Sequence, residues 1–497
     1  MRTFMLTAAM SLASVSGNAA GTAEPSGAQA VQAILNRTLA AHGGAERLRV
    51  AAGFSFELSG GFYAPLQARG YQPPFEPMPF QGRYVFDWAG STSMVESKTV
   101  FPGGYTVHTR ELGGKEPKVF DLHRHAYSRS ASLGQTANAF RFHPLLLLRQ
   151  LSRSDAELTD GGTDTFFERP VHRLQARWPG LASAIEVMID QETMLLAGYR
   201  LPRSYALQPQ GMNKVRFLAY QDQAGLRLPT RITGETLAMP RLGFEMTLAD
   251  QKLGPVSLGD SASSAAGYIE TPPESALAPH IRELAQDVYL VEHLGGQDYA
   301  SLVLVFDDWV AAVEAPLNEK ATTELLAAIQ RIAPGKPLKT MILTHHHDDH
   351  AGGLPAVVDQ GIGVLAPQGA EATLRAIATA NRPGQSLSFD GIAPDSKRVL
   401  ADKHHQVEIY NVSGNPHAEQ ILTIYLPSEK LLFQADMFTN HELQQSNGPA
   451  NAGGIAFVRW LKAKGLAPER IAGAHGTVAS RADINLMLKA AGESLRL

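Results

Sequence analysis

Hydrophobic and polar residues alternate along most of the first half of the chain. The alternating runs are short and are separated by Gly, Pro or Asn residues, which is the pattern of antiparallel strands with one buried face. We interpret these runs as strands: Ser55–Ser59, Gly82–Asp87, Thr92–Thr99, Thr106–Leu112, Lys118–Leu122, Val171–Arg177, Ser183–Asp190, Leu195–Arg200, Val215–Tyr220, Leu226–Thr236 and Phe244–Asp250. Helical spacing is found in Ala28–Ala41 and in Ala137–Leu151. The pattern therefore predicts a curved antiparallel sheet with a few helices over residues 24–255.

The pattern changes in the second half of the chain. Residues 256–279 are rich in Gly, Ser, Ala and Pro, which is typical of a linker. In residues 280–497, apolar runs such as Ala300–Phe306 alternate with amphipathic segments such as Lys320–Ile332, as expected for buried strands between helices. A chain of 497 residues is also too long for one hydrophobic core. We therefore predict an α+β protein of two domains.

The first residues have the features of a secretory signal peptide. A short basic start is followed by the apolar run Phe4–Val15 and by small residues that suit cleavage near residue 23. The alternative is a frayed tail rich in Ala and Ser. We predict that residues 1–23 are removed on export and that the protein is periplasmic or secreted. No other run reaches the roughly 18 apolar residues that a membrane-spanning helix needs, so no membrane span is predicted.

The densest group of metal-binding residue types is the heptapeptide Thr344–His350, which follows an apolar run that reads as a buried strand. Imidazole and carboxylate groups are good zinc ligands. His345 and His347 are two residues apart, so in an extended segment they point to the same side and can share one metal. Asp349 and His350 come next and can turn toward a second metal. The alternative is a solvated His-rich loop that binds metal only adventitiously.

The pattern His-x-His-x-Asp-His resembles the metal-binding signature of the metallo-β-lactamase superfamily. That family supplies three further ligands, each after a later strand, and this chain has a candidate for each in His417, Asp436 and His475. Order, residue type and flanking residues all fit, and the resemblance extends from about Leu284 to the C-terminus. It implies an αββα sandwich with the site at one edge.

The resemblance also implies a role for each residue. His345, His347 and His417 would hold the first zinc ion, Asp349, His350 and His475 would hold the second, and Asp436 would bridge both. Asp349 and Asp436 are the carboxylates that we expect to take part in catalysis. A water shared between two zinc ions ionises near neutral pH, so the expected nucleophile is a metal-bridging hydroxide. Zinc is expected from the ligand types, and Mn or Fe would suit the same set.

Composition excludes some chemistry. The chain has no cysteine, so no disulfide, thiolate ligand or thiol nucleophile exists in it. Its formal net charge is −4 and no long run of Lys and Arg is present, so a nucleic-acid partner is not favoured. The predicted partner is a small-molecule substrate, and the sequence leaves the oligomeric state open.

The predicted reaction is hydrolysis of an ester, a lactone or a similar acyl bond. In zinc β-lactamases the position of Asp436 is not aspartate, so the resemblance is nearer to glyoxalase II and the lactonases. Two alternatives stay open. One is an apolar-ligand-binding periplasmic protein with a non-catalytic metal site, because the N-terminal strand pattern is similar to the half-barrel of periplasmic lipid or lipoprotein carriers. The other is a phosphodiesterase of the same superfamily.

Overall fold

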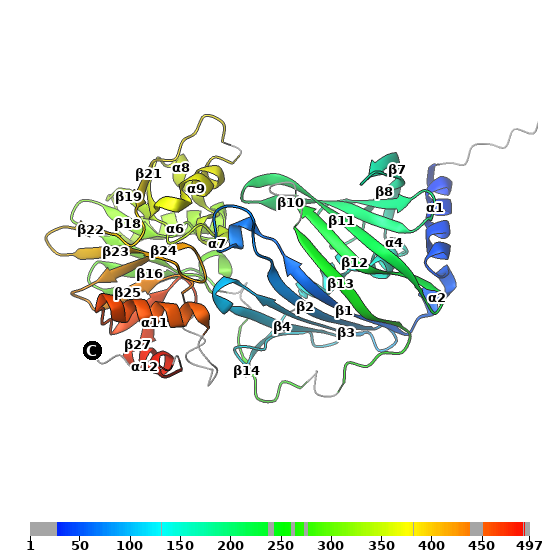
Figure 1. The fold of residues 1–497 in the computed structure, drawn as a ribbon, viewed down its shortest axis with the longest axis horizontal. Coiled ribbons are helices and arrows are strands. Elements are labelled where there is room, and N and C mark those ends of the chain that lie inside the picture. The colour runs from blue at the N-terminus through cyan, green and yellow to red at the C-terminus, as the bar shows by residue number, and fades with distance from the viewer. Residues whose placement is uncertain are drawn as a thin grey trace, which may run out of the picture.

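The computed structural model describes residues 27–130, 132–236, 243–259, 264–272, 277–380, 382–437, 451–490 and 492. Two parts lie side by side in it: a large curved sheet from the first half of the chain and a layered domain from the second half (Figure 1). The predicted signal peptide, residues 1–23, lies outside the described residues. Among the helices that are described, none is long and apolar enough to cross a membrane.

The N-terminal sheet is a long meander. Its strand order among the described residues is β14-β6-β5-β4-β3-β2-β1-β13-β12-β11-β10-β9-β8-β7. The strands are β1 (Gly53–Phe62), β2 (Met78–Asp87), β3 (Thr92–Val100), β4 (Thr106–Gly113), β5 (Lys118–Asp121), β6 (Ala126–Arg129), β7 (Glu157–Phe166), β8 (Arg169–Arg177), β9 (Ile185–Asp190), β10 (Leu196–Tyr205), β11 (Gln208–Gln223), β12 (Leu226–Thr236), β13 (Phe244–Leu253) and β14 (Ile269–Glu270). Pairing of β1 with β13 joins two runs of sequential antiparallel strands into one sheet. The predicted β-rich architecture is confirmed.

Helices cover part of this sheet. Helix α1 (Gly27–Ala41) buries the stripe of Val31, Leu35 and Leu39 that its sequence spacing predicts. The prediction of one helix over Ala137–Leu151 is wrong, because the chain forms α3 (Gly134–Asn138), a 3₁₀ turn η3 (Ala139–Arg141) and α4 (Pro144–Leu151). The break has a local cause. His143 is extended, the proline after it occupies the start of α4, and the His143 Nδ1 atom accepts a hydrogen bond from the Leu145 amide.

The predicted linker contributes to the sheet. In its described part, β14 pairs in parallel with β6. Val256, Leu258, Ala265 and Tyr268 pack against the buried side chains of β2 to β5. The segment is therefore attached to the N-terminal sheet and does not run freely between the domains.

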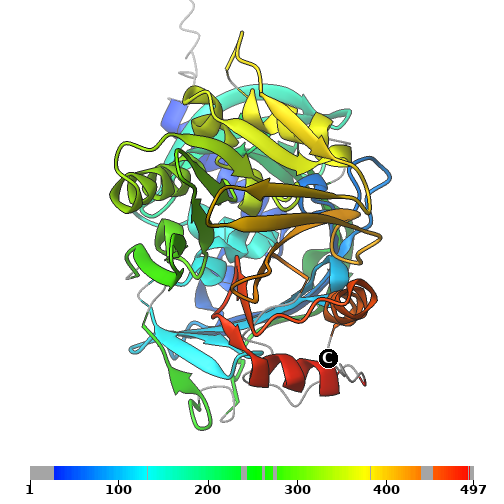
Figure 2. The same cartoon turned by 90° about the vertical axis from the view of Figure 1, so that its left-hand side faces the viewer.

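The C-terminal domain has two mixed sheets with helices outside them, so the predicted αββα sandwich is confirmed (Figure 2). The first sheet contains β15 (His280–Ala285), β16 (Val288–Glu292), β17 (Ser301–Val305), β18 (Val310–Val313), β19 (Leu338–Ile342), β20 (Gly363–Pro367) and β21 (Phe389–Ile392). The second contains β22 (Lys397–Ala401), β23 (Gln406–Ser413), β24 (Gln420–Leu426), β25 (Leu431–Gln434), β26 (Arg470–Gly473) and β27 (Ala479–Ser480).

Hydrophobic side chains fill both interfaces of this sandwich. One core lies between the two sheets and continues under α11 (Ala452–Lys464) and α12 (Arg481–Ala490). A second core lies between the first sheet and the helices α6 (Glu319–Ile332), α8 (Leu354–Asp359) and α9 (Glu371–Ala378). Every residue of β17 is buried, as expected for a strand with both faces covered.

Loops of the N-terminal sheet reach the C-terminal domain. The 3₁₀ turn η1 (Pro65–Gln67) follows β1, and η2 (Pro102–Gly104) follows β3. The Arg69 Nε atom donates to the Asn415 carbonyl at 3.0 Å, and the Tyr71 hydroxyl donates to the Gln420 carbonyl at 3.3 Å. These contacts hold the loop after β1 against one edge of the sandwich.

Candidate metal centre

The candidate ligands come together at the edge of the sandwich that faces the N-terminal sheet. His345 and His347 follow β19, and Asp349 and His350 lie in α7 (Asp348–Ala351). The other three follow strands of the second sheet: His417 lies between β23 and β24, Asp436 follows β25, and His475 follows β26. Strand ends from both sheets thus bring together residues that are up to 130 positions apart in the sequence (475 − 345).

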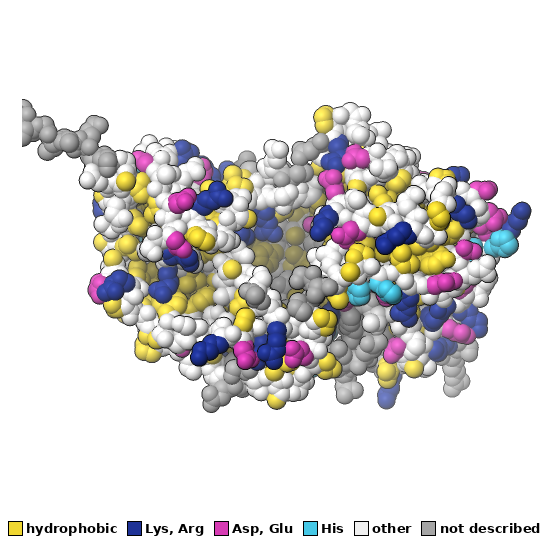
Figure 3. All heavy atoms as spheres, turned by 180° about the vertical axis from the view of Figure 1, so that it is seen from behind, with side chains coloured by type: hydrophobic (Ala, Val, Ile, Leu, Met, Phe, Trp, Pro, Cys, Tyr) yellow, Lys and Arg dark blue, Asp and Glu magenta, His cyan; other side chains and the backbone are white. Residues whose placement is uncertain are grey.

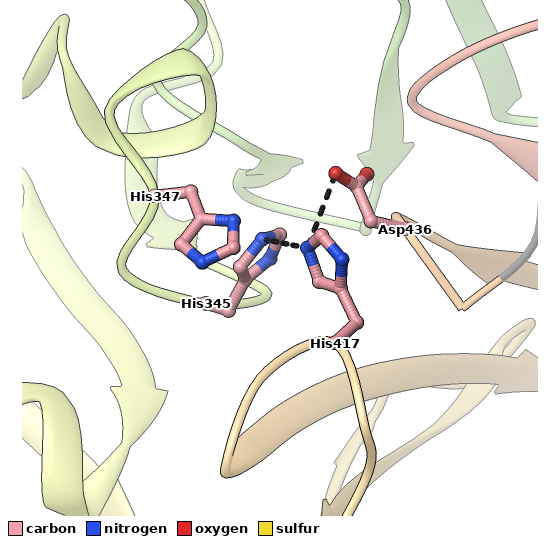
Figure 4. Close-up of side chains that lie close together, drawn as sticks. All are labelled: His345, His347, His417 and Asp436. Atoms are coloured by element: carbon pink, nitrogen blue, oxygen red, sulfur yellow. Dashed lines mark hydrogen bonds and ion pairs between the residues drawn. The ribbon is translucent and has the colours of Figure 1, made fainter. Parts of the chain in front are cut away.

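These seven residues form two groups that share Asp436. His345, His347, His417 and Asp436 form the first group; Asp349, His350, Asp436 and His475 form the second. Within each group, the candidate ligand atoms all lie within 4.8 Å of one another. Figure 4 shows the first group, in which the His417 Nε2 atom lies 3.1 Å from His345 Nε2 and 3.3 Å from Asp436 Oδ2.

The second group has similar spacing. The His350 Nε2 atom lies 3.1 Å from Asp436 Oδ1 and 3.3 Å from Asp349 Oδ2. The His475 Nε2 atom lies 3.3 Å from Asp349 Oδ2 and 3.5 Å from Asp436 Oδ1. Because each carboxylate faces two imidazoles, the nitrogen and oxygen atoms converge on one point.

A buried glutamate supports one histidine of each group. Thr344 donates its hydroxyl hydrogen to Glu314 Oε1 at 2.6 Å, so its oxygen accepts from the Nδ1 atom of His345, 3.0 Å away. The same Glu314 oxygen lies 3.2 Å from His350 Nδ1. Both imidazoles therefore have Nε2 directed toward the candidate metal positions. Glu314 has a φ of +78°, a backbone conformation that costs energy for a residue with a side chain and is often found at functional sites.

Electrostatics keep part of the site neutral and part charged. Burial lowers the pKa of His345 and of His347 well below the ordinary value, which favours the neutral form that binds metals. Burial also opposes protonation of His350, but the carboxylates of Asp349 and Asp436 outweigh it and raise its pKa. Burial opposes ionisation of Asp436, yet the imidazoles of His350 and His475 hold the pKa of this carboxyl below its usual range. A bound cation would therefore displace protons from the second group.

The family of the C-terminal domain follows from comparison with known proteins. Residues 312–475 match the model of the metallo-beta-lactamase superfamily. These residues form a metallo-β-lactamase superfamily domain. The match includes His345 through His475, and hence both groups of candidate ligands. The domain is accordingly that of a metal-dependent hydrolase, and the N-terminal sheet lies outside the matched residues.

Similar structures include a metallo-beta-lactamase from Pontibacter korlensis, with 19% identity, 44% of this chain and 100% of that chain covered, and a TM-score of 0.34. FIM-1 metallo-beta-lactamase from Pseudomonas aeruginosa, in its mono-zinc form, has 18% identity, covers 44% of this chain and 96% of its own, and has a TM-score of 0.34. The sec-alkylsulfatase Pisa1 from Pseudomonas sp. has 14% identity, covers 43% of this chain and 41% of its own, and has a TM-score of 0.33. No curated protein matches the chain.

An unpaired polar atom shows that the metallo-β-lactamase domain fits a metal ion at this position. His347 Nδ1 is buried and has no hydrogen-bond partner among the described residues. A buried polar atom without a partner is costly, and a divalent cation in the first group would supply the missing partner. In the second group, His350 Nε2 and Asp436 Oδ1 lie 3.1 Å apart, so a cation there would replace the proton between them.

The N-terminal sheet supplies groups that the sequence analysis missed. The Ala68 carbonyl accepts from His347 Nε2 at 3.0 Å, and the Pro102 carbonyl accepts from His417 Nδ1 at 3.0 Å. Each bond fixes which nitrogen of the imidazole faces the metallo-β-lactamase site. Gly103 permits this approach, because its φ is +85° and a Cβ atom on it would lie 3.1 Å from the His417 Cβ atom.

The neighbouring polar residues have other surroundings. Asp348 accepts a hydrogen bond from the Gln67 Nε2 atom at 2.6 Å, and burial together with the Asp349 charge raises its pKa to about 6. It contacts no ligand imidazole in the described hydrogen bonds. His346 is buried with its ring 4.6 Å from that of Tyr71. Burial lowers the pKa of His346 to about 3, so it is a neutral packing residue beside the site.

Proposed function

We propose that the protein is an exported dinuclear zinc hydrolase that cleaves an ester, a lactone or a related acyl bond. The observation that carries this proposal is the arrangement of two ligand groups around one shared carboxylate, Asp436. A pair of metals held at catalytic distance by one bridging residue is typical of hydrolytic sites. Export is supported by the sequence of residues 1–23, and zinc is supported by the imidazole and carboxylate ligands.

The chain's own residues prepare the site for this reaction. When bound, two zinc ions supply Lewis acidity and an ionised water near neutral pH. Asp436 sets the spacing of the two groups, and Glu314 holds His345 and His350 in fixed orientations. The Ala68 and Pro102 carbonyls do the same for His347 and His417, so the N-terminal sheet is needed for a rigid first group.

A panel of substrates tests the proposed reaction. We expect zinc-loaded mature protein to hydrolyse carboxyl esters or lactones in preference to thioesters, phosphodiesters, sulfate esters and β-lactams. The control is the His347→Ala variant, because it removes a ligand whose Nδ1 atom is buried without a partner. Cleavage of esters or lactones by the unmutated protein alone supports the proposal. Cleavage confined to phosphodiesters, or none with metals present, would overturn it.

A further inference from the structure

The N-terminal sheet encloses a large apolar cavity next to the metal site. Its volume is about 660 Å³, and its walls include Phe62, Tyr84, Phe142 and Phe244. This volume lies within the range of roughly 300–1,000 Å³ of small-molecule sites. Figure 3 shows a hollow in the middle of the molecule, with hydrophobic side chains on its floor and basic side chains at its edge. Aromatic walls of this kind suit a hydrocarbon chain.

The cavity borders the metal site. Gln67 and Asp348 are both part of its lining. The Gln67 Nε2 atom donates to Asp348 Oδ1 at 2.6 Å and to Asp349 Oδ1 at 2.9 Å. Since Asp349 belongs to the second ligand group, one amide joins the cavity wall to a candidate metal ligand. The Gln67 end of the cavity therefore borders the candidate metal centre, although none of the seven candidate ligands lines the cavity itself.

Two arginines without acidic partners face the same cavity. Arg141 and Arg203 line it, and among the described residues neither forms an ion pair with a carboxylate. The Arg141 Nε atom is buried without a hydrogen-bond partner. Burial and the neighbouring Arg203 charge lower the pKa of Arg141. Glu235 also lines the cavity but pairs with neither arginine. Arg141 is half-buried, whereas Arg203 is exposed beside it. An unpaired cation that is partly withdrawn from water, as Arg141 is, is best satisfied by an anionic ligand.

We propose that this cavity binds the substrate, and that the substrate is an anionic amphiphile with a long hydrocarbon chain. The chain lies among the aromatic side chains, Arg141 and Arg203 hold the acidic group, and the scissile acyl bond lies at the metals. Only the placement of the scissile acyl bond at the metals rests on the proposed hydrolase function. The N-terminal sheet then has a direct role, which is to select long-chain substrates.

The first experiment measures binding, independently of turnover. Laurate and dodecanol are titrated against the full-length, zinc-loaded protein that carries anilinonaphthalene sulfonate, and displacement is followed by fluorescence. We expect laurate to bind about tenfold or more tightly than dodecanol, as expected for a charge-assisted hydrogen bond. Arg141→Met should remove this preference. No saturable binding, or an unchanged preference in Arg141→Met, would overturn the inference.

A pair of variants places the ligand within the cavity. Thr99 lies on β3 and lines the cavity, whereas Lys98 is exposed on the opposite face of the same strand. Thr99→Trp should fill the cavity and weaken laurate binding at least about tenfold, and Lys98→Trp should leave it unchanged. Equal binding by both variants would contradict the assignment.

A second experiment separates this inference from the proposed function. Rates are compared for p-nitrophenyl acetate and for a long-chain ester that carries a terminal carboxylate. We expect a preference for the long-chain ester that Thr99→Trp abolishes and Lys98→Trp retains. Cleavage of acetate without any such preference contradicts the inference and leaves the hydrolase function standing. Absence of all ester cleavage contradicts the proposed function, and the cavity is then judged by the binding experiment alone.

Discussion

Replacement of Asp436 by alanine is expected to lower hydrolysis by about three orders of magnitude. Asp436 is the one residue that belongs to both ligand groups, and its Oδ2 atom lies 3.3 Å from His417 while its Oδ1 atom lies 3.1 Å from His350. Its loss removes a ligand from each metal. Metal ions contribute several kcal/mol to stabilisation of a hydrolytic transition state, and each 1.4 kcal/mol is about tenfold in rate.

The experiment measures kcat, KM and bound metal for the same protein sample. Asp390→Ala is the matched control, because Asp390 is a half-exposed carboxylate of the same domain that pairs with Arg398. We expect the control to retain its rate and its metals. An Asp436→Ala variant with full metal content and a normal rate would show that Asp436 bridges nothing.

Removal of metal is expected to lower the thermal stability of the metallo-β-lactamase domain by about 10 °C. A ligand at roughly a thousand times its Kd stabilises the folded state by about 4 kcal/mol, and in a domain of some 200 residues each kcal/mol shifts Tm by about 2–4 °C. The physical source is local: the buried His347 Nδ1 atom, which has no hydrogen-bond partner, gains one when metal binds.

Calorimetry of protein before and after chelation, and after zinc is restored, measures this shift. His347→Ala should show a much smaller zinc-dependent Tm shift than the unmutated chain.

The zinc-dependent Tm shift of the unmutated chain should also be smaller in acid. His350 has a raised pKa in the metal-free site, so zinc must displace more protons as the pH falls. A Tm that does not respond to zinc at neutral pH would contradict the account.

The candidate ligands could be predicted from the sequence because their chemistry is carried by side chains at fixed spacings. His345, His347, Asp349 and His350 follow one apolar strand, and each of the later ligands follows another. A run of this kind is rare enough to indicate a function by itself. The α+β class followed from hydrophobic periodicity, which reports directly on buried strand and helix faces.

Other parts of the site leave no such signal. The Ala68 and Pro102 carbonyls act through backbone oxygen atoms, which every residue has. Glu314 directly follows the apolar run Val310–Val313, which marks it as the end of a buried strand. The sequence does not show that it contacts Thr344, thirty positions later (344 − 314). Strand β7 was missed because it lies at the sheet edge with mostly polar, exposed residues. The break before Pro144 did have a signal, since proline and the residue before it both disfavour a continuous helix.

The most direct test of the central claim is the metal content of the purified mature chain after zinc reconstitution. Elemental analysis should return two zinc ions per chain, because seven converging residues form two groups that share Asp436. His347→Ala should retain the second metal more firmly than the first, since that residue belongs to the first group only. A content of one zinc ion or none in the unmutated protein would contradict the dinuclear site.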